Sequence, residues 1–216
     1  MIISFLQEKG GAGKTTLTIN LAVMLKTIGW RVLIVDSDPQ GSARDWHEAN
    51  GGETINVVGL DRPTIDIDIK PLKPLYDYIL IDGAPRISSI TAKILTISNL
   101  VLIPVQPSPY DVWASQPLVE LIKQRQIITG GKPNAAFIIS RQITGTKLGN
   151  EIRESIAAYE LPVLNHGTYQ RIIYAESAAK GKTVIDSKTP AMFEISQIEK
   201  EIMGLIGHGH LKDKNE

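Results

Sequence analysis

The chain has 216 residues, of which 43% are apolar, so it can build one domain with a sizeable core. Its formal net charge is zero, so a nucleic acid or membrane partner would have to meet a local patch. The absence of cysteine excludes disulfides, thiolate metal sites and iron–sulfur clusters. No apolar run approaches the about 20 residues that span a bilayer, and we expect a soluble, cytoplasmic protein without a membrane partner.

Short apolar runs alternate with helical periodicity along the chain. Runs that are apolar on both faces are typical of buried parallel strands, and we expect them at 2–6, 31–36, 55–60, 77–82, 100–105 and 135–140. Candidate helices lie between them at 14–28, 40–49, 87–97, 111–129, 146–159, 169–179 and 191–206. The alternation predicts an α/β fold with a doubly wound, mostly parallel sheet flanked by helices.

Two segments stand apart from this pattern. The stretch 61–74 contains three prolines among alternating Asp and Ile residues, and we interpret it as an irregular connection. The last residues are polar. We therefore expect a single domain over residues 1–207 and a polar tail over 208–216.

The first candidate strand leads into the sequence EKGGAGKTT, residues 8–16. It nearly matches the phosphate-binding pattern G-x-x-x-x-G-K-[ST], but Glu8 stands where that pattern has its first glycine. The glycines let successive N–H groups point inward, and the following helix adds its positive end. Lys14 would reach the β- and γ-phosphates, and the Thr15 hydroxyl would bind Mg²⁺. The predicted phosphate cradle comprises Gly10, Gly11, Ala12, Gly13, Lys14, Thr15 and Thr16.

Three carboxylates follow neighbouring candidate strands. Asp36 and Asp38 end the run RVLIVDSD, and Asp82 ends YILID. Acids at strand ends are often ordinary turn residues or helix caps. However, ligands of doubly wound sheets bind at the carboxyl ends of the strands, beside a loop of this kind. The coincidence predicts a site for a metal ion and a water molecule there.

With these motifs the sequence resembles the ParA/MinD family of P-loop ATPases, which have the deviant phosphate loop KGGxGKT. Lys9 matches the signature lysine of that family, and the resemblance implies that it reaches the partner's nucleotide in an ATP-sandwiched homodimer. The resemblance also implies that Asp36 orients or activates the attacking water and that Asp38 belongs to the first switch region, near the metal. Asp82 would hold Mg²⁺ through water. ATP and Mg²⁺ are thus the implied cofactors.

Two further stretches resemble the family more weakly. The stretch IPVQPSPYD, which includes Pro107, matches the segment that flanks the base and shapes the dimer contact in the family. Arg141 falls where the family places a residue beside the adenine. A Pro-rich loop after a strand is also a common connection without such a role.

Features that are missing from the sequence argue against several branches of the family. The nitrogenase iron protein and the arsenite-efflux ATPase depend on cysteines, which this chain does not have. A MinD-like member would need a basic amphipathic helix for the membrane, whereas the polar face of 191–206 is acidic. A biosynthetic relative, such as dethiobiotin synthetase or the cobyrinate enzymes, would usually lack the counterpart of Lys9.

The resemblance is therefore greatest to small ParA-like partition ATPases, whose ATP-bound dimer coats nucleoid DNA nonspecifically. In that branch a centromere-binding, ParB-like protein stimulates hydrolysis. Because the chain opens directly on its first strand, it resembles the form without an extra N-terminal domain. A ParA-like positioner of another cargo remains an alternative, since cargo choice has no readable code.

A DNA-binding face is a further expectation. Residues 121–150 contain no Asp or Glu, and basic residues recur in the C-terminal half of the chain. An acid-poor but merely solvated surface would look the same. The candidate residues are Lys123, Arg125, Lys132, Lys147, Arg171, Lys180, Lys182 and Lys188, together with Arg141 if it does not serve the nucleotide.

Overall fold

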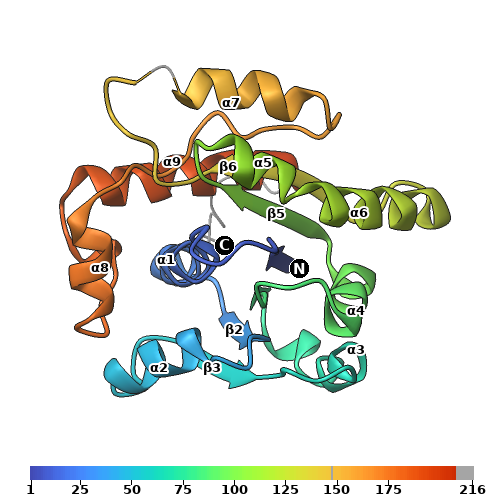
Figure 1. Ribbon diagram of the computed structural model, residues 1–216. Coiled ribbons are helices and arrows are strands. Elements are labelled where there is room, and N and C mark those ends of the chain that lie inside the picture. The colour runs from blue at the N-terminus through green and yellow to red at the C-terminus, as the bar shows by residue number, and fades with distance from the viewer. Residues whose placement is uncertain (147, 208–216) are drawn as a thin grey trace.

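The computed structural model of the chain describes residues 1–146 and 148–207. It has helices on both faces of one sheet (Figure 1). The strands are β1 (Ile2–Phe5), β2 (Val32–Asp36), β3 (Asn56–Gly59), β4 (Tyr78–Asp82), β5 (Leu100–Val105) and β6 (Asn134–Ile139). Their order is β3-β2-β4-β1-β5-β6, and every neighbouring pair is parallel. The predicted doubly wound, parallel sheet is thereby confirmed.

The strands other than β3 are buried on both sides because helices pack on both faces of the sheet, whereas β3, at the edge, is partly exposed. In β2, Ile34 belongs to one hydrophobic cluster, while Leu33 and Val35 belong to the other. The first cluster includes side chains of α1 (Lys14–Thr27), α2 (Ser42–Ala49) and α9 (Pro190–Leu205). The second includes side chains of α3 (Ile65–Asp68), α4 (Ser89–Ile97), α5 (Pro109–Trp113), α6 (Gln116–Thr129) and α7 (Leu148–Ala157). This double burial explains the near-continuous apolar runs of the strands.

Two predicted segments differ from the structure. The expected helix 111–129 consists of α5 and α6, because Pro117 lacks the N–H that would continue one helix across the junction. The stretch 61–74 contains the helical turn α3, which leads into a 3₁₀ turn at Lys73–Leu75. Ile65 and Ile69 are four residues apart and are both fully buried, so this spacing reflects one helical turn.

The C-terminal part of the described chain packs onto the first face of the sheet. Helix α8 (Ile172–Ala178) is followed by a second 3₁₀ turn, Val184–Asp186, and then by α9. Ile195, Ile198 and Ile202 of α9 are fully buried against the first cluster. No helix within 1–146 and 148–207 has the length and apolar character needed to cross a membrane. The predicted tail, 208–216, lies outside the described residues.

The topology brings three loops together at one edge of the sheet. β1 lies between β4 and β5, while β2 lies on the far side of β4. The register pairs Asp82 with Phe5 of β1 and also with Asp36 of β2. The loop after β1 therefore begins beside the two strands that end in Asp36 and Asp82.

Candidate functional site

The loop between β1 and α1 forms the floor of a cavity. Gly11 and Gly13 have φ values of 77° and 94°, which side-chain-bearing residues rarely adopt. The cavity has a volume of about 270 Å³. It borders the first turn of α1, where free N–H groups and the helix dipole favour an anion. It is lined by Gly10, Gly11, Gly13, Lys14, Thr15, Thr16, Asp38, Ser42, Pro85 and Arg141.

Both lysines of the loop are bound within the chain. The Lys14 ammonium is buried and donates a hydrogen bond to the Lys9 carbonyl at 3.2 Å. Burial lowers the pKa of Lys14, while the nearby Asp82 and Asp38 raise it. The Lys9 ammonium lies 2.9 Å from the buried carboxylate of Asp111 in α5. A phosphate that recruits either lysine must therefore replace an internal partner.

Asp82 lies beside Thr15 at the centre of the site. The Thr15 hydroxyl donates to Asp82 Oδ2 at 2.7 Å, while Asp82 Oδ1 is buried without a hydrogen-bond partner in the described part of the chain. Burial is the main cause that raises the pKa of Asp82 to about 7. A carboxylate with an unused oxygen beside a threonine hydroxyl is a donor set that suits Mg²⁺.

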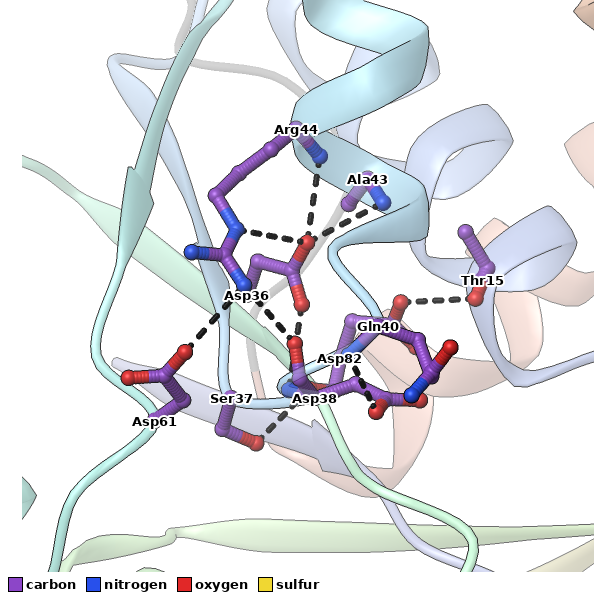
Figure 2. A network of polar contacts seen from close by, with 9 residues as sticks. All are labelled: Thr15, Asp36, Ser37, Asp38, Gln40, Ala43, Arg44, Asp61 and Asp82. Carbon is purple, nitrogen blue, oxygen red and sulfur yellow. Dashed lines mark hydrogen bonds and ion pairs between the residues drawn. The ribbon is translucent and has the colours of Figure 1, made fainter.

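Asp36 has a structural environment that the sequence does not reveal (Figure 2). Its carboxylate is fully buried, and Oδ2 accepts the backbone N–H groups of Ala43 and Arg44, both at 3.1 Å. These are free N–H groups of the first turn of α2, whose own N-cap is Gly41. Asp36 therefore caps α2 from the end of β2. The backbone N–H of Asp38 donates to its other oxygen at 3.1 Å.

Asp38, not Asp36, borders the cavity of the phosphate loop. It lines the cavity together with Lys14 and Thr15, whereas Asp36 is not among the lining residues. One oxygen of Asp38 accepts the backbone N–H of Gln40 at 3.0 Å. Protein donors contact both oxygens of Asp36, and Asp36 does not line the cavity, so the geometry does not favour the expectation that it meets the attacking water, which stays a prediction. Asp38 is the carboxylate that a water in the cavity can reach.

A second cavity of about 380 Å³ adjoins the first and shares Gly13, Thr16 and Arg141 with it. Its volume is in the range that small ligands occupy. Arg141 has a φ of 52°, an uncommon backbone conformation for a residue with a side chain. Pro107 does not line either cavity, but its neighbour Gln106 does. The remaining lining residues are Leu17, Ser140, Thr168, Tyr169, Gln170, Arg171, Tyr174, Ala175 and Ala178.

Several residues that fix this site are absent from the sequence prediction. Gln106 donates to the Gly11 carbonyl at 3.0 Å, and the Ser140 hydroxyl donates to the Ala12 carbonyl at 2.7 Å. Both directly follow the last residue of a strand, β5 or β6, so the rule that led to Asp82 could have found them. Asp111 and Glu194 carry no such signal, because they lie within the helices α5 and α9 and not at the end of a strand.

Comparison with known proteins gives a consistent family. The sequence profile of the CobQ/CobB/MinD/ParA nucleotide binding domain matches residues 3–184. The maintenance of carboxysome distribution protein A of Halothiobacillus neapolitanus is 30% identical over 202 residues, covering 90% of this chain and 93% of that protein. The sporulation initiation inhibitor protein Soj of Bacillus subtilis is 28% identical over 232 residues, covering 85% and 90%.

Solved structures agree in fold. Apo McdA of Cyanothece superposes with a TM-score of 0.79 at 16% identity, covering 93% of this chain and 98% of that protein. An ATP complex of a variant of the same protein gives a TM-score of 0.78 at 16% identity, covering 94% and 96%. The profile match covers most of the chain, including the phosphate loop and all three strand-end carboxylates. The chain therefore belongs to the CobQ/CobB/MinD/ParA family of nucleotide-binding domains, to which the ParA/MinD P-loop ATPases belong.

Proposed function

We propose that the protein is a Mg-ATP-dependent, dimer-forming ATPase of the ParA type that segregates DNA by binding the nucleoid nonspecifically. The observation that carries the proposal is the hydrogen bond of Thr15 with the buried Asp82, beside a glycine loop and the buried Lys14. Such a cluster fits a triphosphate and its cation. The ATP complex of the Cyanothece relative supports the choice of nucleotide.

The position of each site residue indicates the role that we propose for it. Lys14 would exchange the Lys9 carbonyl for phosphate oxygens, and Thr15 and Asp82 would hold Mg²⁺, the ion that neutralises charge on the phosphates when bound. Asp38 would orient the attacking water, since it lines the same cavity. Asp36 keeps α2 and the Asp38 backbone in place through its three N–H contacts.

The nucleoside would occupy the second cavity. It continues from the phosphate cavity along Gly13 and Thr16, and it offers Gln106, Arg141 and Tyr169 as walls. This placement supports the sequence expectation for Arg141 and moves the role expected of Pro107 to its neighbour Gln106.

Lys9 would connect hydrolysis to dimerisation. Its side chain is 41% exposed despite its contact with Asp111, so it can leave that contact toward a second molecule. A second cation on the developing charge acts as an arginine finger does. The partner protein would be a ParB-like activator that binds the centromere.

DNA binding would rest on a smaller basic surface than the sequence suggests. Lys123 pairs with Glu160 at 2.8 Å, and Arg171 pairs with the buried Glu194 at 2.6 Å, so a DNA phosphate would have to compete with a carboxylate for either residue. Lys147 lies outside the described residues. In contrast, Lys180, Lys182 and Lys188 are exposed and form no ion pair with described residues.

A second candidate function is the positioning of a protein cargo. It is favoured by the similarity to the carboxysome distribution protein of Halothiobacillus neapolitanus, which extends over 90% of the chain. The nucleotide chemistry would be the same, and only the activating partner would differ. A centromere-binding protein that fails to stimulate hydrolysis, together with a cargo protein that does, would select this candidate.

Nucleotide binding and hydrolysis test the proposed roles directly. Lys14→Ala should abolish ATP binding, because it deletes the charge aimed at the phosphates. Asp38→Ala should retain ATP affinity but lose hydrolysis by about a hundredfold, because water is positioned only on the way to the transition state. Asp36→Ala should mainly lower the melting temperature, since it uncaps α2.

Calorimetric titration and phosphate release measure these effects with each variant's unfolding as a control. Hydrolysis by Asp38→Ala at the parent rate would return the water-positioning role to Asp36. ATP binding that survives in Lys14→Ala would contradict the nucleotide site as a whole.

A further inference from the structure

Glu194 of α9 is a buried carboxylate beside the second cavity and has no role in the phosphate chemistry. Its Oε1 accepts a hydrogen bond from Arg171 Nε at 2.6 Å. Its Oε2 accepts the Tyr169 backbone N–H at 3.1 Å and the Tyr174 hydroxyl at 2.9 Å. Only 8% of its side chain is exposed. The Glu194 carboxylate thus contacts three residues of one short segment, Tyr169, Arg171 and Tyr174.

The three partners of Glu194 share one property: each lines the second cavity. Tyr169 and Arg171 precede α8, and Tyr174 lies in its first turns. The Arg171 guanidinium also lies over the Tyr169 ring at 5.7 Å, so the two side chains are fixed relative to each other. Because α9 itself is anchored in the core through Ile195 and Ile198, Glu194 ties this wall to a rigid support.

We propose that Glu194 is a positioning residue for the nucleoside, holding the wall formed by Tyr169, Arg171 and Tyr174 in the shape that receives it. The inference rests on the proposed function, because it takes the second cavity as the nucleoside site. Glu194 does not line the phosphate cavity. Its contribution should therefore concern the nucleoside alone.

The substitution Glu194→Gln separates the proposal from a general loss of packing. Gln keeps the size of the side chain, but it loses the charge that pairs with Arg171 and turns one acceptor into an NH₂ donor that faces other donors. The wall then loses at least one of its three contacts. We expect the affinity for ATP to fall by about tenfold.

Inorganic tripolyphosphate serves as the probe without a nucleoside. Its affinity, measured with Mg²⁺ by the same calorimetric titration, should remain within about twofold of the parent in Glu194→Gln. Tyr174→Phe removes one of the three contacts and should show the same pattern more weakly. This variant also decides the case if Glu194→Gln does not fold.

Glu199→Gln is the matched control. Glu199 is also buried on α9, at 3% exposure, but its charge lies near Tyr78, a core residue that does not line the cavity. It should leave the affinities for ATP and tripolyphosphate unchanged. Unchanged ATP affinity in Glu194→Gln and Tyr174→Phe, equal losses for both probes, or the same ATP loss in Glu199→Gln would overturn the role of Glu194. A parent protein that binds tripolyphosphate but not ATP would also overturn it, whereas a parent that binds neither would refute the proposed nucleotide site.

Discussion

The buried carboxylate of Asp82 lowers the stability of the ionised protein unless a bound cation compensates its charge. Its carboxylate is buried at the junction of β1, β2 and β4, and one oxygen has no partner among the described residues. Ionisation in that position costs free energy, because neither water nor a protein cation compensates the charge fully. The site therefore holds a charge for a ligand at the expense of stability, which is common at functional sites.

This cost predicts a pH-dependent effect of Asp82→Asn on the nucleotide-free protein. Burial raises the folded-state pKa of Asp82 from 3.8 to about 7, so the penalty is fully present above about pH 7 and disappears as the pH falls toward 4. At pH 8 the variant should have a free energy of unfolding higher than the parent's by on the order of 2 kcal/mol. Urea unfolding between pH 5 and 8 measures the difference, and a pH-independent difference would contradict the buried charge.

Asp36 and Asp38 show the limit of prediction at the same scale. A pair of acids after a strand can be placed at the sheet edge from the sequence, and both do lie there. Which of the two lines the cavity depends on the docking of α2, since its free N–H groups bind the Asp36 carboxylate. That docking is a tertiary contact with no local signal, so the pattern DSDPQ could not distinguish the two roles.

At the scale of elements, the strands were predictable and the helix junctions were only partly so. Strands buried on both faces leave an apolar run that is hard to mistake. The break between α5 and α6 could have been predicted from Pro117, and α3 could have been predicted from the four-residue spacing of Ile65 and Ile69. The second cavity could not be predicted, because its walls come from the loops after β5 and β6 and from α1 and α8. The contact of Glu194 with Arg171 also joins residues that are 23 positions apart.

The last helix, α9, makes a separate prediction about core packing. Ile198 is fully buried, whereas Phe193, on the same helix, is 62% exposed. Ile198→Ala should lower the free energy of unfolding by about 3 kcal/mol, because it leaves a cavity in the core. Phe193→Ala should change it by less than about 0.5 kcal/mol. Denaturant titration compares the two, and equal small effects would mean that α9 is not part of the core.

In the whole molecule, the basic residues expected to bind DNA belong to different parts of the fold. Figure 1 shows α6 and α8 on opposite sides of the view. Lys123 and Arg125 lie in α6, whereas Lys180 and Lys182 follow α8 directly, so the basic residues expected in one surface belong to two elements. The α8 side, with Lys180, Lys182 and Lys188, is the surface that we assign to DNA. Lys132, which is exposed near the end of α6, provides a control on the other side.

DNA retention should depend on salt and on nucleotide. With ATP, the logarithm of the affinity for random-sequence duplex DNA should fall by about 0.9 per log unit of salt for each phosphate contacted. Replacing Lys180, Lys182 and Lys188 by Gln should weaken retention and make this slope shallower, whereas Lys132→Gln should not. A filter-binding series with ATP and ADP measures both effects. Retention that ignores salt and nucleotide would remove DNA from the account and favour the cargo-positioning alternative.

The contact of Lys9 with Asp111 complicates any test of dimerisation. Lys9→Gln alone leaves a buried carboxylate without its cation, which lowers stability for a reason unrelated to the dimer. The double variant Lys9→Gln, Asp111→Asn removes both charges and should recover most of that stability. It therefore serves as a folded protein that lacks the Lys9 charge without leaving a buried carboxylate unpaired.

The mass of the protein in solution, measured by light scattering with Mg-ATP and with Mg-ADP, shows whether ATP drives dimerisation through Lys9. We expect the parent to be a dimer with ATP and a monomer with ADP. Lys9→Gln and the double variant should bind ATP but remain monomers. A parent dimer of equal strength with ADP, or an ATP-dependent dimer in both Lys9 variants, would contradict the proposal that Lys9 connects the nucleotide to association.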